Sequence, residues 1–353
     1  MPVNAASAAG PVFVHAWWRA SSTWFWAKLR RQPGLRCYYE PLNERLAYWT
    51  APLLRGYRPD PAALRRSKHP PMERPYFAEY LELYEAGGTG YALPLSYERY
   101  LLAPGKEDAA LERYLAGLIA HAAARKERAV LCFVRSPMRA LWMKRRFGGL
   151  HIAQLRNPRD QWASFRAQGR NGSSYFTAGM LLIAERLQAR FPAALAGMPA
   201  LPRLTLRPRA LSADGPALAP QAEYRLFMLL WLASALQSLS ASEIVLDSDR
   251  LSSDAAGRRA VEAALAAQGL RADLSDAAAP SHVELPLAAK ALQAAEEWAV
   301  RRLARESRAL ALFDPARVTA GLARLAPVSR SLVQRSLAAC GRASTPRAAP
   351  PRG

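Results

Sequence analysis

The chain has 353 residues, with 49 Lys and Arg against 28 Asp and Glu, so its formal net charge is +21. Hydrophobic residues make up 51% of the sequence, which allows a sizeable core and argues against a wholly disordered chain. The longest apolar stretch, 226–236, is about half of a membrane span, and no cation precedes Arg19 as a signal peptide would require. We therefore expect a folded protein with neither feature, built as one large domain with insertions or as two smaller ones.

The cysteines indicate the redox compartment, and the charge indicates which classes of partner are possible. The three cysteines lie far apart and form no Cys-x-x-Cys pair, so we expect no disulfide framework, no zinc knuckle and a reducing cytoplasm. The positive charge fits nucleic acid, a smaller anion such as a phosphate or sulfate ester, or a coding bias towards arginine that implies no partner. Of the 49 cations, 43 are arginine, and they are scattered along the chain instead of forming one basic arm.

In chain order, the first elements are two short strands on either side of a helix. The apolar run 11–16 predicts a buried strand, and 36–39 is the second strand. The helix between them covers 23–30, and Ser21 or Ser22 is placed to cap it.

The rest of the chain alternates strands and helices after a long irregular segment. Residues 43–128 contain many prolines and little strand pattern, as in an insertion. The further elements that we expect are helices 76–86 and 108–127, strand 129–134, helix 138–147, strand 151–155, helices 156–167, 175–190 and 222–239, strand 244–246, and helices 254–268 and 287–312. Strand followed by helix, repeated in this way, implies an α/β fold with parallel strands and helices on both faces of the sheet.

This order of elements predicts the organisation of the domains. We expect one α/β domain, 11–275, with a helical insertion at about 43–128. A helical C-terminal extension, 276–344, and a disordered basic tail, 345–353, follow it.

Two segments have the features of an anion site at a strand-to-helix junction. Arg19-Ala-Ser-Ser-Thr23 joins a cation and three hydroxyls to a helix N-terminus, whose unpaired N–H groups suit a phosphate, but it lacks the GxxxxGK[ST] pattern of nucleotide triphosphatases. Arg156 ends another strand, and Ser164 lies two turns into the following helix. Each segment alone is equally a capped helix with solvated arginines, whereas the pair suits a ligand with two phosphate groups.

The pair of segments resembles the sulfotransferase family, whose donor is 3′-phosphoadenosine 5′-phosphosulfate (PAPS). Residues 12–29 look like the family's loop for the 5′-phosphosulfate, a strand followed by Pro-Lys/Arg-Ser-Gly-Thr-Thr-Trp and a helix, with Ser21 in the place of the glycine. Residues 154–164 look like its loop for the 3′-phosphate, since Arg156 and Ser164 keep the family's spacing of eight residues. Weaker similarities lie at 37–42, 133–147 and 244–251.

The resemblance implies a three-layer P-loop NTPase-like fold and the transfer of a sulfuryl group from PAPS to a hydroxyl of a carbohydrate, glycolipid or related small acceptor. It places Arg19 beside the bridging oxygen of the donor, where a cation neutralises the leaving group. The implied donor contacts are Ser21, Ser22 and Thr23 at the 5′-phosphate, Trp24 at the adenine, and Arg156 and Ser164, with Arg159 assisting, at the 3′-phosphate. Trp24 is equally a core aromatic of its helix.

A hydroxyl acceptor needs a general base, and Glu40 is the first candidate. It directly follows the second strand, and carbohydrate sulfotransferases have a catalytic glutamate at a similar position. Glu44, one turn further on, and His15, at the end of the first strand, are the alternatives. No cluster of Asp, Glu or His has the spacing of metal ligands, so we expect no metal.

Other functions remain open from the sequence. The charge is compatible with a nucleic-acid-binding or scaffold protein, although the aromatic RNA-binding motifs are absent. An inactive relative of the sulfotransferases, or one with another donor, also fits the missing loop glycine. A kinase with an unusual phosphate loop is disfavoured, because GK[ST] and a Mg²⁺-binding acid at a strand end are missing.

Overall fold

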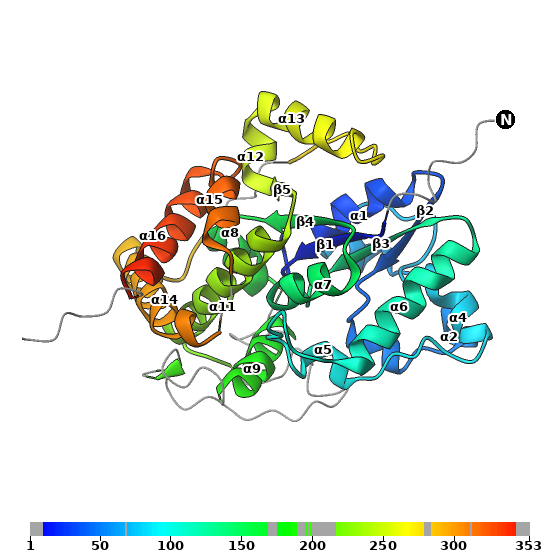
Figure 1. Ribbon diagram of the computed structural model, residues 1–353, viewed down its shortest axis with the longest axis horizontal. Helices are drawn as coiled ribbons and strands as arrows, with labels where there is room; N and C mark the ends of the chain where they lie inside the picture. Colours follow the sequence, from blue (N-terminus) through cyan, green and yellow to red (C-terminus); the bar gives the residue numbers. More distant parts are fainter. Residues whose placement is uncertain are drawn as a thin grey trace, which may run out of the picture.

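The fold is built around a sheet of five parallel strands in the order β2-β3-β1-β4-β5 (Figure 1). The computed structural model describes residues 10–67, 69–168, 175–188, 195, 196, 198, 217–278, 284–310 and 313–343. The strands are β1 (Val12–Ala16), β2 (Leu35–Tyr39), β3 (Arg128–Phe133), β4 (Leu150–Leu155) and β5 (Ile244–Asp247). The prediction of an α/β fold with a central parallel sheet is confirmed at this level.

Helices and 3₁₀ turns connect and cover the strands. They are α1 (Ser22–Arg30), η2 (Glu44–Ala47), α2 (Ala51–Gly56), α3 (Pro61–Ser67), η3 (Ala78–Tyr80), α4 (Leu81–Glu85), α5 (Pro94–Tyr97), α6 (Ala109–Ala124), η4 (Pro137–Arg139), α7 (Ala140–Phe147), α8 (Pro158–Arg166), α9 (Tyr175–Gln188), α11 (Pro220–Ala241), α12 (Ser248–Ser253), α13 (Ala255–Ala266), α14 (Ala289–Leu310), α15 (Pro315–Leu322) and α16 (Pro327–Ala343). In Figure 1, α14 to α16 gather on the left of the sheet, and α2, α4 and α6 on the right.

The sheet separates two hydrophobic cores. Side chains of successive strand residues point to opposite faces, so Ile244 and Leu246 of β5 enter one core and Val245 enters the other. The first core also contains α1 and α6, whereas the second surrounds α11, which is buried along nearly its whole length. α11 packs on β4 and against α7, α9, α14, α15 and α16.

Residues 76–86 depart from the single helix expected there. Phe77 has a left-handed backbone (φ 62°), and only the short η3 and α4 follow it. The side chains of Phe77 and Tyr80 are buried in the core beside Tyr38 and Tyr39, and this packing turns the chain inward at the point where a continuous helix would begin. The predicted loop at 198–220 lies mostly, and the predicted tail at 345–353 wholly, outside the described residues.

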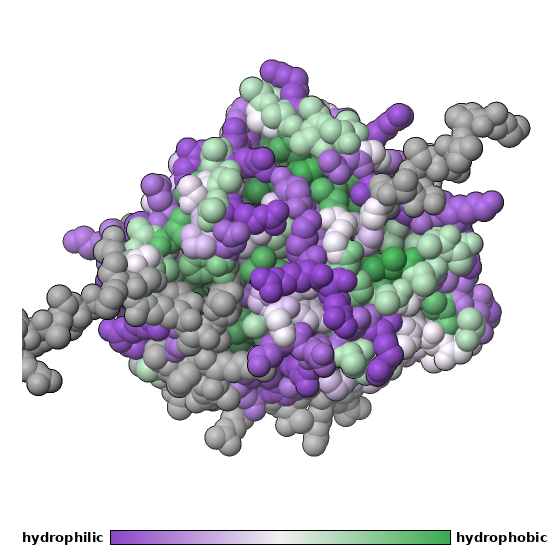
Figure 2. Space-filling view, viewed as in Figure 1, coloured by the Kyte–Doolittle hydropathy of each residue, from purple (hydrophilic) through white to green (hydrophobic). Residues whose placement is uncertain are grey.

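Polar residues are distributed over the visible face of the molecule (Figure 2) and form no single patch there. On the face shown in Figure 2, hydrophilic side chains are interspersed with hydrophobic ones from one end of the molecule to the other. In the described part of the chain, no helix has both the length and the apolar composition that crossing a membrane requires.

A chain of three hydrogen bonds lies buried in the sheet between β1 and β4. Ser136 Oγ lies 2.7 Å from Nδ1 of His15, His15 Nε2 lies 2.9 Å from Nδ1 of His151, and His151 Nε2 lies 2.9 Å from the carbonyl oxygen of Gly148. Since a carbonyl only accepts, Nε2 of His151 donates, and each preceding group then donates to the next ring. With both rings protonated the chain cannot form, because His15 Nε2 and His151 Nδ1 would then both be donors.

The environment of the two histidines favours their neutral state. Burial is the largest cause that lowers the pKa of both rings. The charge of His151 and then that of Lys144 add to it at His15, and Lys144 adds to it at His151, where the Gly148 carbonyl and Glu243 partly oppose it. The pKa of His151 falls to about 4, and that of His15 lies well below its ordinary value. In the unfolded chain both rings titrate normally, so the unfolded state takes up protons first as the pH falls.

We expect the free energy of unfolding to fall between about pH 6.5 and pH 4, because a folded-state pKa below the unfolded one stabilises only above the unfolded value. His151 alone accounts for about 3 kcal/mol at most, from a pKa lowered to about 4. Urea unfolding of the protein and of His151→Gln, at about pH 7.5 and about pH 5, measures this difference. An equal loss of stability in the two proteins would contradict the assignment.

Candidate functional site

The carboxyl ends of the five strands place charged residues in one row. Parallel strands end at the same edge of a sheet, so the residues that follow them lie side by side. In the order of the sheet these are Glu40 after β2, Arg135 after β3, Arg19 after β1, Arg156 after β4 and Asp249 after β5. Three arginines thus lie between two carboxylates along this edge.

The two predicted anion loops meet at this edge. The Nε of Arg19 donates to Ser164 Oγ at 3.1 Å, and Nη1 of Arg156 donates to the carbonyl oxygen of Arg19 at 3.1 Å. Burial, and then the charge of Arg156, lower the pKa of Arg19; burial also lowers the pKa of Arg156, against the effect of Asp249. Two partly buried cations that repel each other form a site which an anion between them would stabilise.

Further hydrogen bonds hold the two loops in register. The side-chain amide of Gln161, on α8, donates to the carbonyl oxygen of Trp18 at 2.6 Å. The carboxylate of Asp249, after β5, accepts from the backbone N–H of Asn157, the N-cap of α8. The loop between β4 and α8 is therefore tied to the segments that follow the neighbouring strands, β1 and β5.

The loop before α1 adopts a glycine-like shape although it contains no glycine. Arg19 (φ 65°) and Ser21 (φ 63°) both have left-handed backbones. Alternation of this kind turns successive N–H groups towards one side and forms a concave anion site. The sequence predicted that Ser21 or Ser22 caps the helix; Ser21 is the N-cap, but its side chain makes no capping hydrogen bond.

The other predicted donor contacts are placed unequally. Ser22 is half-buried at the first helical position, and Thr23 is buried with its hydroxyl 3.0 Å from Tyr39 Oη. Trp24 points elsewhere: its indole N–H donates to Asp276 at 3.2 Å, and the ammonium of Lys28 lies 5.0 Å from its ring centre. The structure thus brings Arg19, Arg156 and Ser164 together, while the adenine contact of Trp24 stays a prediction.

Glu40 forms an ion pair with Arg135, a residue that was not predicted from the sequence. Nη1 of Arg135 lies 2.8 Å from Oε2 of Glu40, which also accepts from the side-chain amide of Asn43 at 2.5 Å. Nη2 of Arg135 lies 2.8 Å from Oε2 of Glu44. The two candidate bases, Glu40 and Glu44, therefore share one buried cation. Arg135 lies two residues after the end of β3, and this place at a strand end was the only signal in the sequence.

His69 is a second residue that the sequence did not single out. Its Nδ1 is hydrogen-bonded to the hydroxyl of Tyr76, whose ring stacks on Tyr39 at 4.7 Å. Burial, and then the charge of Arg19, lower the pKa of His69 to about 4. The ring is therefore neutral near pH 7 and close to the arginines, but in sequence it lies in the insertion with no motif around it.

Two residues considered from the sequence lie away from this edge. His15 is fully buried and both of its ring nitrogens are hydrogen-bonded, to Ser136 and His151, which counts against it as an alternative base. Arg159 does not face the predicted anion loops: its Nε and Nη2 donate to the carboxylate of Glu296, on α14, at 2.7 and 3.0 Å.

Among the described residues, no group of three or more His, Cys, Asp or Glu is placed to hold a metal ion.

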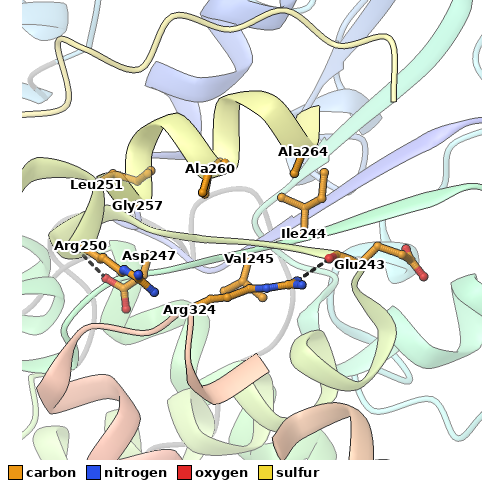
Figure 3. A pocket seen from close by; sticks show the side chains of 11 residues that line it. Glu243, Ile244, Val245, Asp247, Arg250, Leu251, Gly257, Ala260, Ala264 and Arg324 are labelled. Carbon is orange, nitrogen blue, oxygen red and sulfur yellow. Dashed lines mark hydrogen bonds between the residues drawn. The ribbon is translucent and has the colours of Figure 1, made fainter. Parts of the chain in front are cut away.

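A separate pocket of about 240 Å³ lies along the outer side of β5, between α13 and the side chain of Arg324 (Figure 3). Its lining is mostly apolar, from Ile244, Val245, Leu251 and the small residues of α13. None of the sequence-predicted site residues lines it, so we base the site on the charged row and not on this pocket.

Comparisons with protein-family models, curated proteins and solved structures found no match.

We expect Ser21→Gly to leave the protein as stable as before or up to about 1 kcal/mol more stable. Glycine adopts a left-handed backbone without the penalty of about 1–2 kcal/mol that other residues carry, which offsets its larger entropy in the unfolded chain. Ser22→Gly, at the first helical position, is the matched control and should destabilise by about 0.5 kcal/mol or less. Urea unfolding compares the variants, and a larger loss for Ser21→Gly than for Ser22→Gly would contradict the loop geometry.

Proposed function

We propose that the protein is a sulfotransferase that transfers a sulfuryl group from PAPS to a hydroxyl of a carbohydrate, glycolipid or related small acceptor. The observation that carries this proposal is the meeting of Arg19, Arg156 and Ser164 from two strand-to-helix loops, beside a carboxylate at the same sheet edge. The five-stranded parallel sheet is compatible with a three-layer P-loop-like fold, in which phosphate groups bind at this edge.

The residues present fit a donor with two separate phosphate groups. Arg19 and the N-terminus of α1 face one group, while Arg156, Ser164 and the N-terminus of α8 face the other. The left-handed backbone of Ser21 supplies the loop shape for which the family uses glycine. The absent glycine is therefore weak support for an inactive protein.

The proposed reaction is an in-line displacement at sulfur. Glu40 takes the proton of the acceptor hydroxyl as the new oxygen–sulfur bond forms, and the bond from sulfur to the bridging phosphate oxygen breaks. The electron pair stays on that oxygen, where Arg19 balances the developing negative charge. Positioning and electrostatics thus carry the step, with no covalent enzyme intermediate.

The alternative of a nucleic-acid-binding or scaffold protein rests on the charge of +21. It predicts binding of DNA or RNA that weakens steeply with salt, and no binding of a small nucleoside bisphosphate. The scattered polar surface in Figure 2 gives it no specific support on the face shown.

We expect adenosine 3′,5′-bisphosphate to bind the protein, and Arg19→Ala and Arg156→Ala each to weaken binding by about 10- to 100-fold, because each removes charge-assisted hydrogen bonds. Isothermal titration calorimetry measures the dissociation constants. Arg159→Gln is the matched control, since Arg159 is paired with Glu296, and should change the constant less than about threefold. Failure of the unchanged protein to bind at millimolar ligand would end the proposal.

The general base is tested by comparing Glu40→Gln with His69→Asn. We expect Glu40→Gln to lower kcat for transfer of labelled sulfate by about 100-fold or more, with bisphosphate binding retained, because a positioned base contributes about 10²–10⁴-fold. His69→Asn should have the smaller effect on kcat. The acceptor is taken from a screen of hydroxyl compounds, and a larger loss in His69→Asn would assign the base to His69 instead.

A further inference from the structure

Arg135 lies at the centre of a buried cluster that holds two carboxylates with one cation. Its side chain is only 1% exposed, against 7% for Glu44 and 14% for Glu40. Tyr175, at the start of α9, donates its hydroxyl hydrogen to Oε1 of Glu44 at 2.5 Å, and Nη2 of Arg135 donates to the same tyrosine. Nε of Arg135 points to Tyr97 Oη at 3.4 Å. The cluster therefore carries a formal excess of one negative charge.

Aromatic rings close the cluster off from water. The guanidinium carbon of Arg135 lies 5.6 Å from the ring centre of Trp18 and 5.8 Å from those of Tyr97 and Tyr175. Burial opposes the charge of Arg135, but Glu44, Tyr175, Tyr97 and Glu40 outweigh it, so its pKa lies well above the ordinary value. Arg135 thus stays positively charged whatever happens to one of its two carboxylates.

The two carboxylates differ in their surroundings. Both oxygens of Glu44 are directed at Arg135 and Tyr175, deep in the cluster. Glu40 is more exposed, lies next to the strand end, and is near the hydroxyls of Tyr39 and Tyr76, where burial first and then its charge help to raise the pKa of both. If Glu40 takes a proton, Arg135 is still balanced by Glu44, and no buried cation is left unpaired.

We propose that Arg135 and Glu44 are positioning residues that let Glu40 change its charge during the reaction. Arg135 aims Glu40 before the step, and Glu44 keeps Arg135 paired after it. This inference rests on the proposed function, in which Glu40 is the general base. The proton passes from the acceptor hydroxyl to a Glu40 carboxylate oxygen and then to solvent, so the cluster begins and ends each turnover with the same net charge.

Two single variants should move the titration of Glu40 in opposite directions. Glu44→Gln removes a neighbouring negative charge, so the midpoint of the Glu40 titration should move down by about 1–2 pH units. Arg135→Met removes the cation, so the midpoint should move up by a similar amount. The double variant Arg135→Met/Glu44→Gln removes both charges and should return the midpoint to within about 0.5 pH unit of the unchanged protein.

The measurement is a pH titration of the carboxyl carbons by ¹³C nuclear magnetic resonance, with glutamate labelled at the side-chain carboxyl. The Glu40 signal is the one missing in Glu40→Gln, and each variant is titrated alone and with saturating adenosine 3′,5′-bisphosphate. Glu79→Gln is the matched control, because Glu79 forms a buried pair with Arg30 outside the charged row, and it should leave the Glu40 midpoint unchanged.

Shifts of the same sign in both single variants, or no shift in Glu44→Gln, would overturn the proposal. Arg135→Met leaves two buried carboxylates and is the variant most prone to unfold. Glu44→Gln and the double variant lack that problem, so the sign of the Glu44→Gln shift decides the matter by itself. Because titration and bisphosphate binding are measured separately, a protein that shows the opposed shifts but no binding supports the charge balance and contradicts the proposed function.

Discussion

The parallel pairing of β1 with β4 is the constraint on which the rest of the site depends. It places two loops from distant parts of the sequence side by side, although Arg19 and Ser164 are 145 residues apart. An antiparallel arrangement of these strands would send the loops to opposite edges, and a non-adjacent parallel arrangement would separate them by the strands between. Once they are adjacent, the backbone of one loop satisfies the arginine of the other, as the bond from Arg156 to the Arg19 carbonyl shows. The candidate anion site therefore depends on the pairing of the strands and not on either motif alone.

Charge is balanced differently on the two sides of this edge. Around β2 and β3 each charged group already has a partner within the chain, because Glu40 and Glu44 share Arg135. Around β1 and β4 the charge of Arg156 disfavours the charged form of Arg19, and Asp249 and Asp160 supply opposing charge at Arg156. This difference in charge pairing suits a reaction in which the arginines near β1 and β4 bind an anionic donor and the carboxylates near β2 and β3 accept and release one proton.

The sequence predicted the strands, their parallel direction and the pairing of two arginine loops in one site, since these follow from short apolar runs and local spacing. It did not predict Arg135, whose bonds to Glu40 and Glu44 span more than 90 residues and leave no local pattern. Nor did it predict the neighbourhood of His69, which depends on how the insertion folds back over Tyr76. The left-handed backbone of Ser21 was also missed, because serine rarely adopts it and only the surrounding loop imposes it.

The structure also gives a physical use for part of the arginine excess that composition alone left without a role. Several arginines donate to backbone carbonyls where helices or strands end, instead of facing an anion. Arg128 binds the carbonyls of Gly10 and Gln268, and Arg139 binds those of Leu95 and Ser96 from a fully buried position. Arg330 reaches three carbonyls of the turn between α15 and α16.

A planar guanidinium with five N–H donors suits this task better than the single ammonium of lysine, because it can join two segments of chain at once. Arginines used in this way hold loops together and contribute net charge without requiring a polyanionic partner. The charge of +21 is therefore weaker support for nucleic-acid binding than it is from composition alone, and Arg19 and Arg156 stand out because they face each other across two loops. The inference of a small anionic ligand depends on that local pair, and the overall excess of cations adds little to it.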